Sequence, residues 1–549
     1  MNIFRKYLTV ILALLIILLL SVSLVSAQAL DRPIGTVTTK VLVRGASIHG
    51  TNGLAVDDQG KLYIASVIGR EILIMDPKTG KILDRYGPES GVEGPDDVAF
   101  GPDGSLYWTD ILTGEVGRRS PDGVVKKQFV ATFVNPITFS DDGRLFVAQA
   151  FLGDGLYEVD PDLEADPVLI LGTGNPAYHL NAMDFGPDGK LYAPRQQLNQ
   201  IVRIDVDTAE VEVLTDQFEG ACKFDSQGRL HVGVDDRVVR FDPASGEVTT
   251  VAGLPNDGVD NIVFDSEDRL FVSNFRDGSI HAILPNGKAR ELSPSGLMAP
   301  GGIAVLPDDH AGESVFVADF WTVRGFDGLN GQPGLSGRDF FFDSPFTASA
   351  DGDNLVLTSW FGNTVEVWKP STNEIVEIYP FEVPMNAVRF QTDLVVAELG
   401  TGSVVRMDAG SGERTTIATG LFVPTGLATT DDDLWVADWA TGMVWQIVAD
   451  GQVLDVPALV ATGLAQPEGL VAECDTSLLV VESGAGRLSR IDLNSGDVTT
   501  LAADLALGAT APPEWPPTWL FNGVAIGERG DIYVTGDIGN VIYRINELP

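Results

Sequence analysis

A unit of four short apolar strands recurs twelve times along the chain, and this repeat constrains the fold more than any other feature. Each unit opens with a strand such as 52–56, turns at an Asp/Gly pair, and returns as a second strand such as 61–65. A third strand and an Asp-Pro-x-x-Gly turn, as at 242–246, lead to a fourth. Such a unit cannot bury its faces alone, so copies stacked around an axis form a β-propeller. The predicted fold is all-β, with twelve four-stranded blades in two tandem six-bladed rings.

The spacing of the repeats places the two rings. The residues just before the first strands stand at 52, 96, 135, 181, 220, 260, 301, 346, 386, 425, 468 and 522, so the last interval, 54 positions, is the longest. The least regular stretch, 292–345, predicts a junction near Met298, with a first ring at 30–297 and a second at 298–549. The last unit stops after its third strand, and segment 36–42 alternates like a strand that could close this blade. In that case the chain ends meet in one ring.

The N-terminus has the layout of a secretory signal peptide. Arg5 and Lys6 precede an apolar run from Leu8 to Val25, and Ala27-Gln28-Ala29 follows as a cleavage site of small residues. We therefore predict a signal peptide at 1–29 and a protein secreted to the extracellular space or the periplasm. An uncleaved membrane anchor, with the protein facing outside, is the alternative, because the run is nearly long enough to span a bilayer.

The chain is strongly acidic, with a formal net charge of −41. A surface of this charge repels nucleic acid and anionic membranes, so we expect no nucleic-acid partner and no membrane contact beyond the N-terminal segment. It favours divalent cations or cationic groups on a partner; a purely solvating role is the alternative. The two cysteines, Cys222 and Cys474, form no disulfide framework and are expected to be buried. Nothing in the sequence decides the oligomeric state.

The mouth of the first ring predicts a metal site. In a propeller the first strand of each blade lines the axis, so its starting residue faces the channel mouth. Amide and carboxylate oxygens that converge on an axis suit Ca²⁺ or another divalent cation. The predicted ligands are Asn52, Asp96, Asn135, Asn181 and Asp260. The alternative is that these residues only cap turns. His49 and His179 shortly precede two of them and could overhang the mouth as bases.

The second ring has an acidic mouth with aromatic neighbours. Its second strands mostly end in acidic residues, and aromatic residues directly follow several of them. Charge, stacking and cation–π contact then suit a cationic or sugar-like ligand, either a small molecule or a group on a protein partner. The predicted ligand-binding residues are Asp319, Trp321, Trp360, Asn386, Glu398, Asp438, Trp439, Glu468, Glu482 and Asn522. Packing of the aromatic rings between blades is the alternative.

Several strand starts resemble those of the gluconolactonase/regucalcin superfamily and of the related NHL-repeat and streptogramin-lyase propellers. Asn52-Gly53-Leu54, Asn522-Gly523-Val524 and Pro467-Glu468-Gly469 resemble metal-ligand segments of that superfamily, as does Pro95-Asp96-Asp97. The resemblance implies one divalent ion on the axis that polarises a lactone or ester carbonyl, with an Asp as base or nucleophile. The Glu match, Glu468, falls in the second half of the chain, whereas the Asp matches, Asp96 and Asp260, fall in the first.

Three functions follow as hypotheses. The first is a Ca²⁺-dependent lactone or ester hydrolase, with Asp96 and Asp260 as the catalytic candidates, Asp260 as the base, and the metal stabilising the oxyanion. The second is a non-catalytic propeller that binds a ligand or protein on the second ring, and the third is a purely structural role for the ions. A streptogramin-lyase activity is a remote alternative that rests on Trp435–Trp439, because the His expected at a strand start is missing.

Overall fold

The computed structural model describes residues 37–150, 153–172, 174–307, 312–336 and 343–547. Residues Thr39–Asn546 form one compact unit. The predicted signal peptide, 1–29, lies outside the described residues. Within the described ranges, no helix is long and apolar enough to cross a membrane.

The described residues form twelve four-stranded antiparallel sheets and contain no α-helix. The helical segments among them are three 3₁₀ turns, η1 (Pro88–Ser90), η2 (Gln196–Leu198) and η3 (Ser483–Ala485). In eleven of the sheets all neighbouring strands are consecutive in the chain, as expected for hairpin-linked blades, whereas the twelfth pairs β1 with β48. The predicted all-β fold with twelve blades is confirmed.

The first six sheets form a closed ring. Each innermost strand contacts the innermost strand of the next sheet, and β2 contacts β22 to close the circle. The first blade contains β2 (Leu54–Val56), β3 (Leu62–Ser66), β4 (Glu71–Asp76) and β5 (Lys81–Tyr86), and the second contains β6 (Pro95–Phe100), β7 (Leu106–Asp110), β8 (Glu115–Arg119) and β9 (Val125–Phe129). The third blade contains β10 (Val134–Phe139), β11 (Leu145–Gln149), β12 (Leu156–Val159) and β13 (Val168–Leu171), and the fourth contains β14 (Asp184–Phe185), β15 (Leu191–Arg195), β16 (Gln200–Asp205) and β17 (Glu210–Thr215). The fifth blade contains β18 (Ala221–Phe224), β19 (Leu230–Val234), β20 (Arg237–Asp242) and β21 (Glu247–Gly253), and the sixth contains β22 (Val259–Phe264), β23 (Leu270–Asn274), β24 (Ile280–Ile283) and β25 (Ala289–Ser293).

The other six sheets form a second ring, which closes through contacts between β26 and β46. The seventh blade contains β26 (Pro300–Pro307), β27 (Glu313–Asp319), β28 (Thr322–Asp327) and β29 (Pro333–Ser336), and the eighth contains β30 (Thr347–Asp351), β31 (Asn354–Ser359), β32 (Thr364–Lys369) and β33 (Glu374–Pro380). The ninth blade contains β34 (Pro384–Phe390), β35 (Asp393–Glu398), β36 (Ser403–Met407) and β37 (Arg414–Thr419), and the tenth contains β38 (Pro424–Thr429), β39 (Leu434–Asp438), β40 (Met443–Ala449) and β41 (Gln452–Ala461). The eleventh blade contains β42 (Pro467–Cys474), β43 (Ser477–Glu482), β44 (Arg487–Asp492) and β45 (Val498–Ala502), and the twelfth contains β46 (Val524–Ile526), β47 (Ile532–Gly536) and β48 (Val541–Glu547), with β1 (Val37–Arg44) as its fourth strand.

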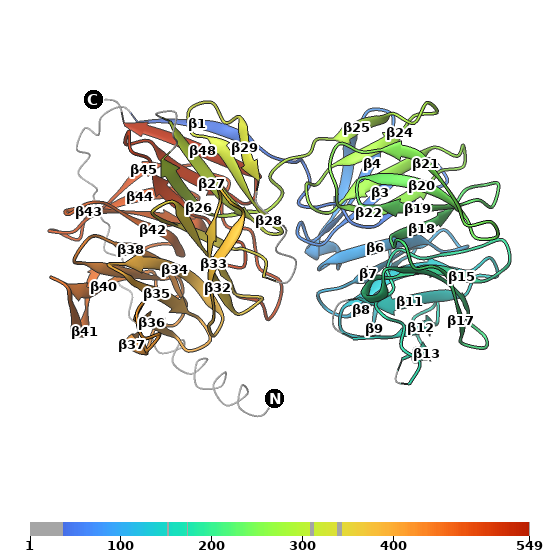
Figure 1. The fold of residues 1–549 in the computed structure, drawn as a ribbon, viewed down its shortest axis with the longest axis horizontal. Helices are drawn as coiled ribbons and strands as arrows, with labels where there is room; N and C mark the ends of the chain where they lie inside the picture. Colours follow the sequence, from blue (N-terminus) through green and yellow to red (C-terminus); the bar gives the residue numbers. More distant parts are fainter. Residues whose placement is uncertain (1–36, 151–152, 173, 308–311, 337–342, 548–549) are drawn as a thin grey trace. The chain divides into compact units, whose positions relative to one another are not determined.

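The last sheet joins strands from both ends of the chain. Its order is β1-β48-β47-β46, and Figure 1 shows the blue strand β1 beside the red strand β48. Just after β1, Gly45 N donates to Asn540 O (2.7 Å), and Asn540 Nδ2 donates to Ala46 O (3.1 Å). The whole first ring is therefore inserted, in sequence, between the first strand of the second ring and its remaining strands.

The turns of the blades explain why Asp and Gly recur in the repeat. Between the first two strands of a blade, Asp57 Oδ1 accepts the backbone N–H groups of Gln59 (2.9 Å) and Lys61 (2.8 Å). Gly60 in the same turn has a φ of +75°, which favours glycine. Asp242 Oδ1 accepts Ala244 N (2.9 Å) in the turn between the outer strands of another blade. Each carboxylate replaces the partners that the backbone loses at the turn.

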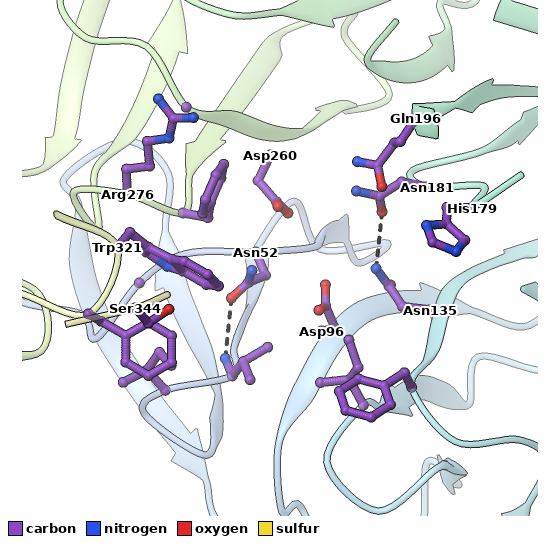
Figure 2. A pocket seen from close by; sticks show the side chains of 18 of the residues that line it. Asn52, Asp96, Asn135, His179, Asn181, Gln196, Asp260, Arg276, Trp321 and Ser344 are labelled. Carbon is purple, nitrogen blue, oxygen red and sulfur yellow. Dashed lines mark hydrogen bonds between the residues drawn. The ribbon is translucent and has the colours of Figure 1, made fainter. Parts of the chain in front are cut away.

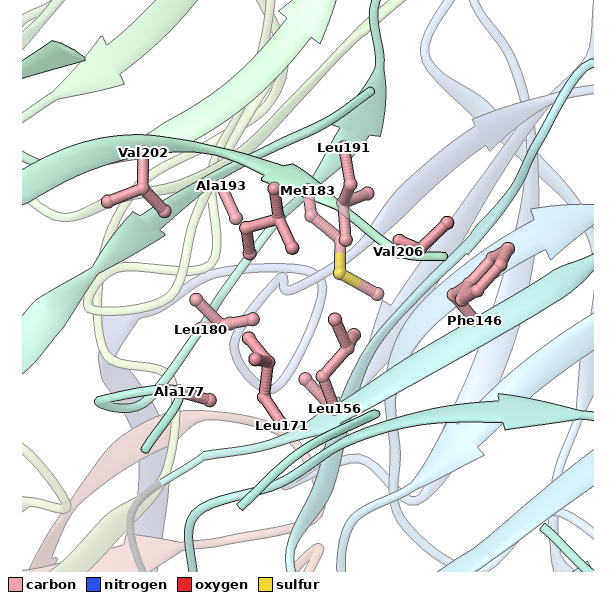
Figure 3. Close-up of a cluster of buried hydrophobic side chains, with 12 residues drawn as sticks. Phe146, Leu156, Leu171, Ala177, Leu180, Met183, Leu191, Ala193, Val202 and Val206 are labelled. Carbon is pink, nitrogen blue, oxygen red and sulfur yellow. The ribbon is translucent and has the colours of Figure 1, made fainter. Parts of the chain in front are cut away.

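The core lies between the faces of neighbouring sheets. Figure 3 shows one such cluster, in which Phe146 and Leu171 of the third blade meet Leu191 and Val202 of the fourth. All four side chains are fully buried. Burial of one such aliphatic or aromatic side chain contributes about 1.5–3 kcal/mol, so stacking of the blades is the main stabilising interaction of each ring.

The two cysteines differ from each other. Cys222 is buried, as the sequence predicts, but Cys474 is exposed, so that prediction is wrong for Cys474. Cys474 ends β42, where its sulfur contacts the hydroxyl groups of Thr476 (3.2 Å) and Ser477 (3.3 Å). Burial decreases along β42 toward its last residue, Cys474, so position in the strand decides the exposure of this thiol.

We predict that removal of β1 destabilises the second ring. A chain that begins at residue 45 leaves β48 as an open edge of a three-stranded blade. We expect its melting temperature to fall by about 2–4 °C for each kcal/mol lost in a ring of this size. A chain that begins at residue 37 is the control, and scanning calorimetry is the measurement. Equal melting of both chains would contradict a stabilising role for β1.

Candidate functional site

A cavity of about 1070 Å³ lies within the compact unit Thr39–Asn546. All five residues predicted as metal ligands line it: Asn52, Asp96, Asn135, Asn181 and Asp260. We call these five residues the floor. Figure 2 shows the carboxylates of Asp96 and Asp260 directed into the same space, with the three asparagines around it. The structure therefore brings the predicted set together, while its role as a metal site stays a prediction.

Three of these residues reach the cavity because the innermost strands are irregular where they begin. In β6 the ladder pairs Pro95 with Asp110 and then passes directly to Val98 and Trp108, so Asp96 and Asp97 fall outside it. The same irregularity omits Asn135 in β10 and Asp260 in β22. A bulge of this kind changes the direction of side chains at the end of a strand. In β6 it sends Asp96 to the cavity and buries Asp97 beside it.

Gly53, which follows Asn52, lies so close to the next blade that a larger residue would not fit there. Gly53 N donates to Asp96 O (2.7 Å), and a Cβ at Gly53 would collide with Asp97. Gly469 and Gly523 approach neighbouring innermost strands in the second ring in the same way. The Asn-Gly and Glu-Gly pairs of the sequence thus mark places where two blades touch at the axis.

The two floor carboxylates disfavour each other's ionised form. Burial, together with the charge of Asp97, raises the pKa of Asp96 to about 7. Burial raises the pKa of Asp260 well above its usual value, and the charges of Asp96 and Asp97 raise it further, while a hydrogen bond from Asn52 opposes the rise. A cation between the two carboxylates would compensate their charges and reverse both shifts.

The asparagines supply an oxygen without a partner. Asn135 Nδ2 donates to Asn181 Oδ1 (3.0 Å), which also accepts the backbone N–H of Ala182 (2.9 Å). Asn135 is 1% exposed, and its Oδ1 has no hydrogen-bond partner among the described residues. A buried acceptor left unpaired costs about 1–3 kcal/mol. The floor thus offers carboxylate and carboxamide oxygens, the donor set of a hard cation, and the residues fit the predicted ion.

No group of three or more His, Cys, Asp or Glu side chains within the described ranges is arranged to hold a metal ion. The floor is consistent with this finding, because only two of its five residues carry carboxylates. Any ion there would depend on the carboxamide oxygens of Asn52, Asn135 and Asn181.

A charge network lies next to the floor inside the first ring. Asp97 accepts hydrogen bonds from Ile137 N (3.2 Å) and Asn261 Nδ2 (3.1 Å). Burial raises the pKa values of Asp97 and Asp184, and the nearby ammonium group of Lys223 opposes both shifts. Lys223 Nζ also donates to Met183 O (3.1 Å). Lys223 is the cation that accompanies Asp97 and Asp184, so we restrict the predicted metal site to the five floor residues.

Of the ten predicted ligand-binding residues, only Trp321 lines this cavity. Four of the carboxylates accept backbone N–H groups from the segment that enters their own blade: Asp319 from Met298 and Ala299, Glu398 from Glu382, Asp438 from Phe422 and Val423, and Glu482 from Ala465. These bonds give the acidic strand ends a structural role, and their role in ligand binding stays a prediction.

The other predicted residues of the second ring lie elsewhere. Glu468 Oε2 accepts Asn522 N (2.7 Å), and burial, with the charge of Asp537, raises the pKa of Glu468 well above its usual value. Asn386 is buried and accepts from Ser349 Oγ at 3.5 Å. Trp360 is buried and donates from Nε1 to Trp519 O (3.1 Å), whereas the backbone N–H of Trp439 donates to Val423 O (2.9 Å).

The two candidate histidines have different positions. His49 donates from Nε2 to Asp537 O (2.7 Å), and burial lowers its pKa. His179 lines the cavity, and its Nε2 contacts Gln197 Nε2 at 3.0 Å. Only His179 therefore lies where it could face a ligand.

Sequence reasoning missed several cavity residues. Trp515 and Trp519 lie between β45 and β46, in the segment that makes the last repeat interval the longest. Glu219 also lines the cavity, and burial, with the charge of Asp235, raises its pKa to about 7. The long interval was a signal for the two tryptophans, whereas no pattern in the sequence marks Glu219.

Comparisons with known proteins identify similar folds only. No protein-family model and no curated protein matches the sequence. A solved virginiamycin B lyase from Staphylococcus aureus is similar over 52% of this chain and 96% of its own, with 19% identity and a TM-score of 0.36. A gluconolactonase from Xanthomonas campestris covers 46% of this chain and 91% of its own, with 16% identity and a TM-score of 0.37.

A third similar structure spans both rings. The extracellular domain of a hybrid two component system from B. thetaiotaomicron covers 93% of this chain and 82% of its own, with 12% identity and a TM-score of 0.31. The predicted resemblance to gluconolactonase-type and streptogramin-lyase-type propellers is thereby confirmed as a resemblance.

The floor predicts a pH dependence of stability. The pKa of Asp96 is higher in the folded protein than its ordinary value of 3.8, so the folded state holds a proton that the unfolded state has released. Without a divalent cation, the free energy of unfolding should therefore fall as the pH rises from about 4 to about 7. We expect Asp96→Asn to reduce this fall by about 1–4 kcal/mol. Urea unfolding in EDTA at pH 5 and pH 8 is the measurement, and an unchanged pH dependence in the variant would contradict the assignment.

Proposed function

We propose that this protein is an exported, divalent-cation-dependent hydrolase of a lactone or ester, with Ca²⁺ as the first candidate ion. The observation that carries the proposal is the convergence of Asp96, Asp260 and the buried, unpartnered Asn135 Oδ1 on one cavity. The N-terminal sequence pattern supports export.

The floor residues have different roles in this proposal. Asn135 and Asn181 hold the ion together with Asp96, and Asn52 positions Asp260 by a hydrogen bond. When bound, the cation supplies Lewis acidity toward a carbonyl oxygen. The low polarity that burial gives the site strengthens each of these electrostatic contacts.

Asp260 is the base in this proposal. It takes a proton from a water molecule whose oxygen bonds to the carbonyl carbon of the substrate. The bond between the acyl carbon and the ring or ester oxygen then breaks, and the leaving alkoxide takes the proton back from Asp260. The products are an alcohol and a carboxylic acid, which on one chain make a hydroxy acid; the acid releases its proton to solvent.

A non-catalytic binding propeller is the second candidate. Aromatic side chains face the same cavity as the floor, and such a surface binds a ligand whether or not it is hydrolysed. In this case a small molecule or a group of a protein partner occupies the cavity. A cation that binds without any turnover would favour this candidate or a purely structural ion.

We predict that Ca²⁺ stabilises the EDTA-treated protein and that the floor carboxylates carry the effect. Asp96→Asn should weaken Ca²⁺ binding at least about tenfold, because it removes the carboxylate that holds the ion, whereas Asp260→Asn should weaken binding less and abolish turnover, because it removes the base. Asp455→Asn, an exposed acid on β41, is the matched control. Calorimetric titration with Ca²⁺ measures the affinity, and hydrolysis of a panel of lactones measures turnover.

The outcomes separate the hypotheses. Turnover that requires Ca²⁺ and is lost in Asp260→Asn supports the hydrolase. Stabilisation by Ca²⁺ without turnover of any lactone or ester favours binding or a structural ion. If neither Ca²⁺ nor EDTA changes the melting temperature or the turnover, the floor holds no metal ion and the proposal fails.

A further inference from the structure

Several segments of the second ring line the cavity whose floor belongs to the first ring. Phe320 and Trp321 follow β27, and Trp515 and Trp519 lie in the long connection between β45 and β46. Phe361, after β31, completes this set, which we call the wall. Figure 2 shows Trp321 and Ser344 of the second ring in the same cavity as Asn52 and Asp260. The cavity therefore belongs to neither ring alone.

The wall is held in place by contacts among its own aromatic rings and with the neighbouring Trp360. Trp515 stacks on Phe361 with ring centres 6.2 Å apart, and it meets Trp360 and Trp519 edge-on at 5.1 and 5.9 Å. Phe361 nevertheless stays 37% exposed. A fixed, partly exposed aromatic surface that lines a cavity is suited to a ligand with a flat apolar face.

The wall also carries a buried donor without an acceptor. Trp519 is 1% exposed, and its Nε1 has no hydrogen-bond partner among the described residues. Indole N–H groups usually find a partner when buried. The wall thus has an unpaired donor and the floor an unpaired acceptor, Asn135 Oδ1, and an occupant with an acceptor at one end would complement the wall.

First-ring residues hold the wall over the floor. The Arg70 guanidinium donates from Nη1 to Thr510 O (3.0 Å) and Ala511 O (3.1 Å), just before Trp515, and it pairs with Glu93 in its own ring. A second link lies nearby, where Arg324 Nη2 donates to Arg276 O (2.7 Å). Phe275 of the first ring packs edge-on against Trp321 at 5.6 Å. Arg70 is therefore a positioning residue for Trp515.

We propose that the two rings build one composite ligand site, in which the floor receives the carbonyl end of the ligand and the wall receives a flat apolar ring. The unpaired indole N–H of Trp519 can donate to an acceptor on the ligand, such as a lactone or ester oxygen. The ligand class is thus a lactone or ester that is fused to, or carries, a flat apolar ring. The position of the carbonyl rests on the proposed function, whereas contact with the wall does not require a cation.

The wall is tested by ligand binding in EDTA, where no cation-dependent turnover occurs. The probe is 3,4-dihydrocoumarin, a lactone fused to a benzene ring, and calorimetric titration measures its dissociation constant. We expect Trp515→Ala and Phe361→Ala to raise this constant at least about tenfold, and Trp515→Phe to keep it within about threefold. Phe422→Ala is the matched control, because Phe422 is exposed and lies outside the cavity lining.

Arg70→Met tests the link between the rings. We expect it to weaken binding of dihydrocoumarin about as much as Trp515→Ala does, while the Ca²⁺ affinity of the floor stays at the wild-type value. A general loss of structure would lower both affinities and the melting temperature together, and would contradict a positioning role for Arg70.

The results separate this inference from the proposed function. If Ca²⁺ does not bind but the wall variants weaken dihydrocoumarin binding, the proposed function fails and the composite site stands. If wild type and folded Trp515→Ala and Phe361→Ala bind the probe equally, the composite site is wrong, whatever Ca²⁺ does. Tighter binding of tetraethylammonium, or of δ-gluconolactone, which lacks a flat apolar ring, would overturn the assigned ligand class.

Discussion

The structure depends on the burial of both faces of every four-stranded sheet against its neighbours. Side chains such as Phe146 and Leu191 lose all contact with water only because adjacent blades stack. A single blade would leave one or both faces exposed, so neither ring is stable until it closes. Contacts between β2 and β22 in one ring, and between β26 and β46 in the other, complete this burial.

The same constraint creates the floor. Six innermost strands crowd together at the axis, and the bulged starts of β6, β10 and β22 turn Asp96, Asn135 and Asp260 out of the regular ladder. Burial beside one another raises the pKa values of both carboxylates. The packing that stabilises the ring thus leaves unfavourable charge at its mouth, and a cation is the simplest partner for that charge.

Much of the fold and the floor could be predicted from the sequence because a repeat fixes equivalent positions. Asn52 and Asp260 are distant in sequence, but both stand just before a first strand, and a closed ring brings such positions together. The wall could not be predicted in this way. Trp515 and Trp519 lie in an insertion outside the repeat, and only the packing of the second ring onto the first shows that they share the cavity with Asp260. The sequence predicts a ligand surface from the acidic strand ends of the second ring, such as Asp438, but it does not show the backbone N–H groups that these carboxylates accept.

The placement of β1 has a consequence for the order of events during synthesis. The strand is synthesised before the whole first ring, whereas its partner β48 follows all the other strands of both rings. The first ring is complete by β25 and can fold while the rest of the polypeptide is still being translated. The edge of β1 must stay unpaired during all of that time, and pairing strands so far apart in sequence is intrinsically slow. Closure of the second ring is then the last step of maturation, and the cavity, which needs both rings, exists only from that moment.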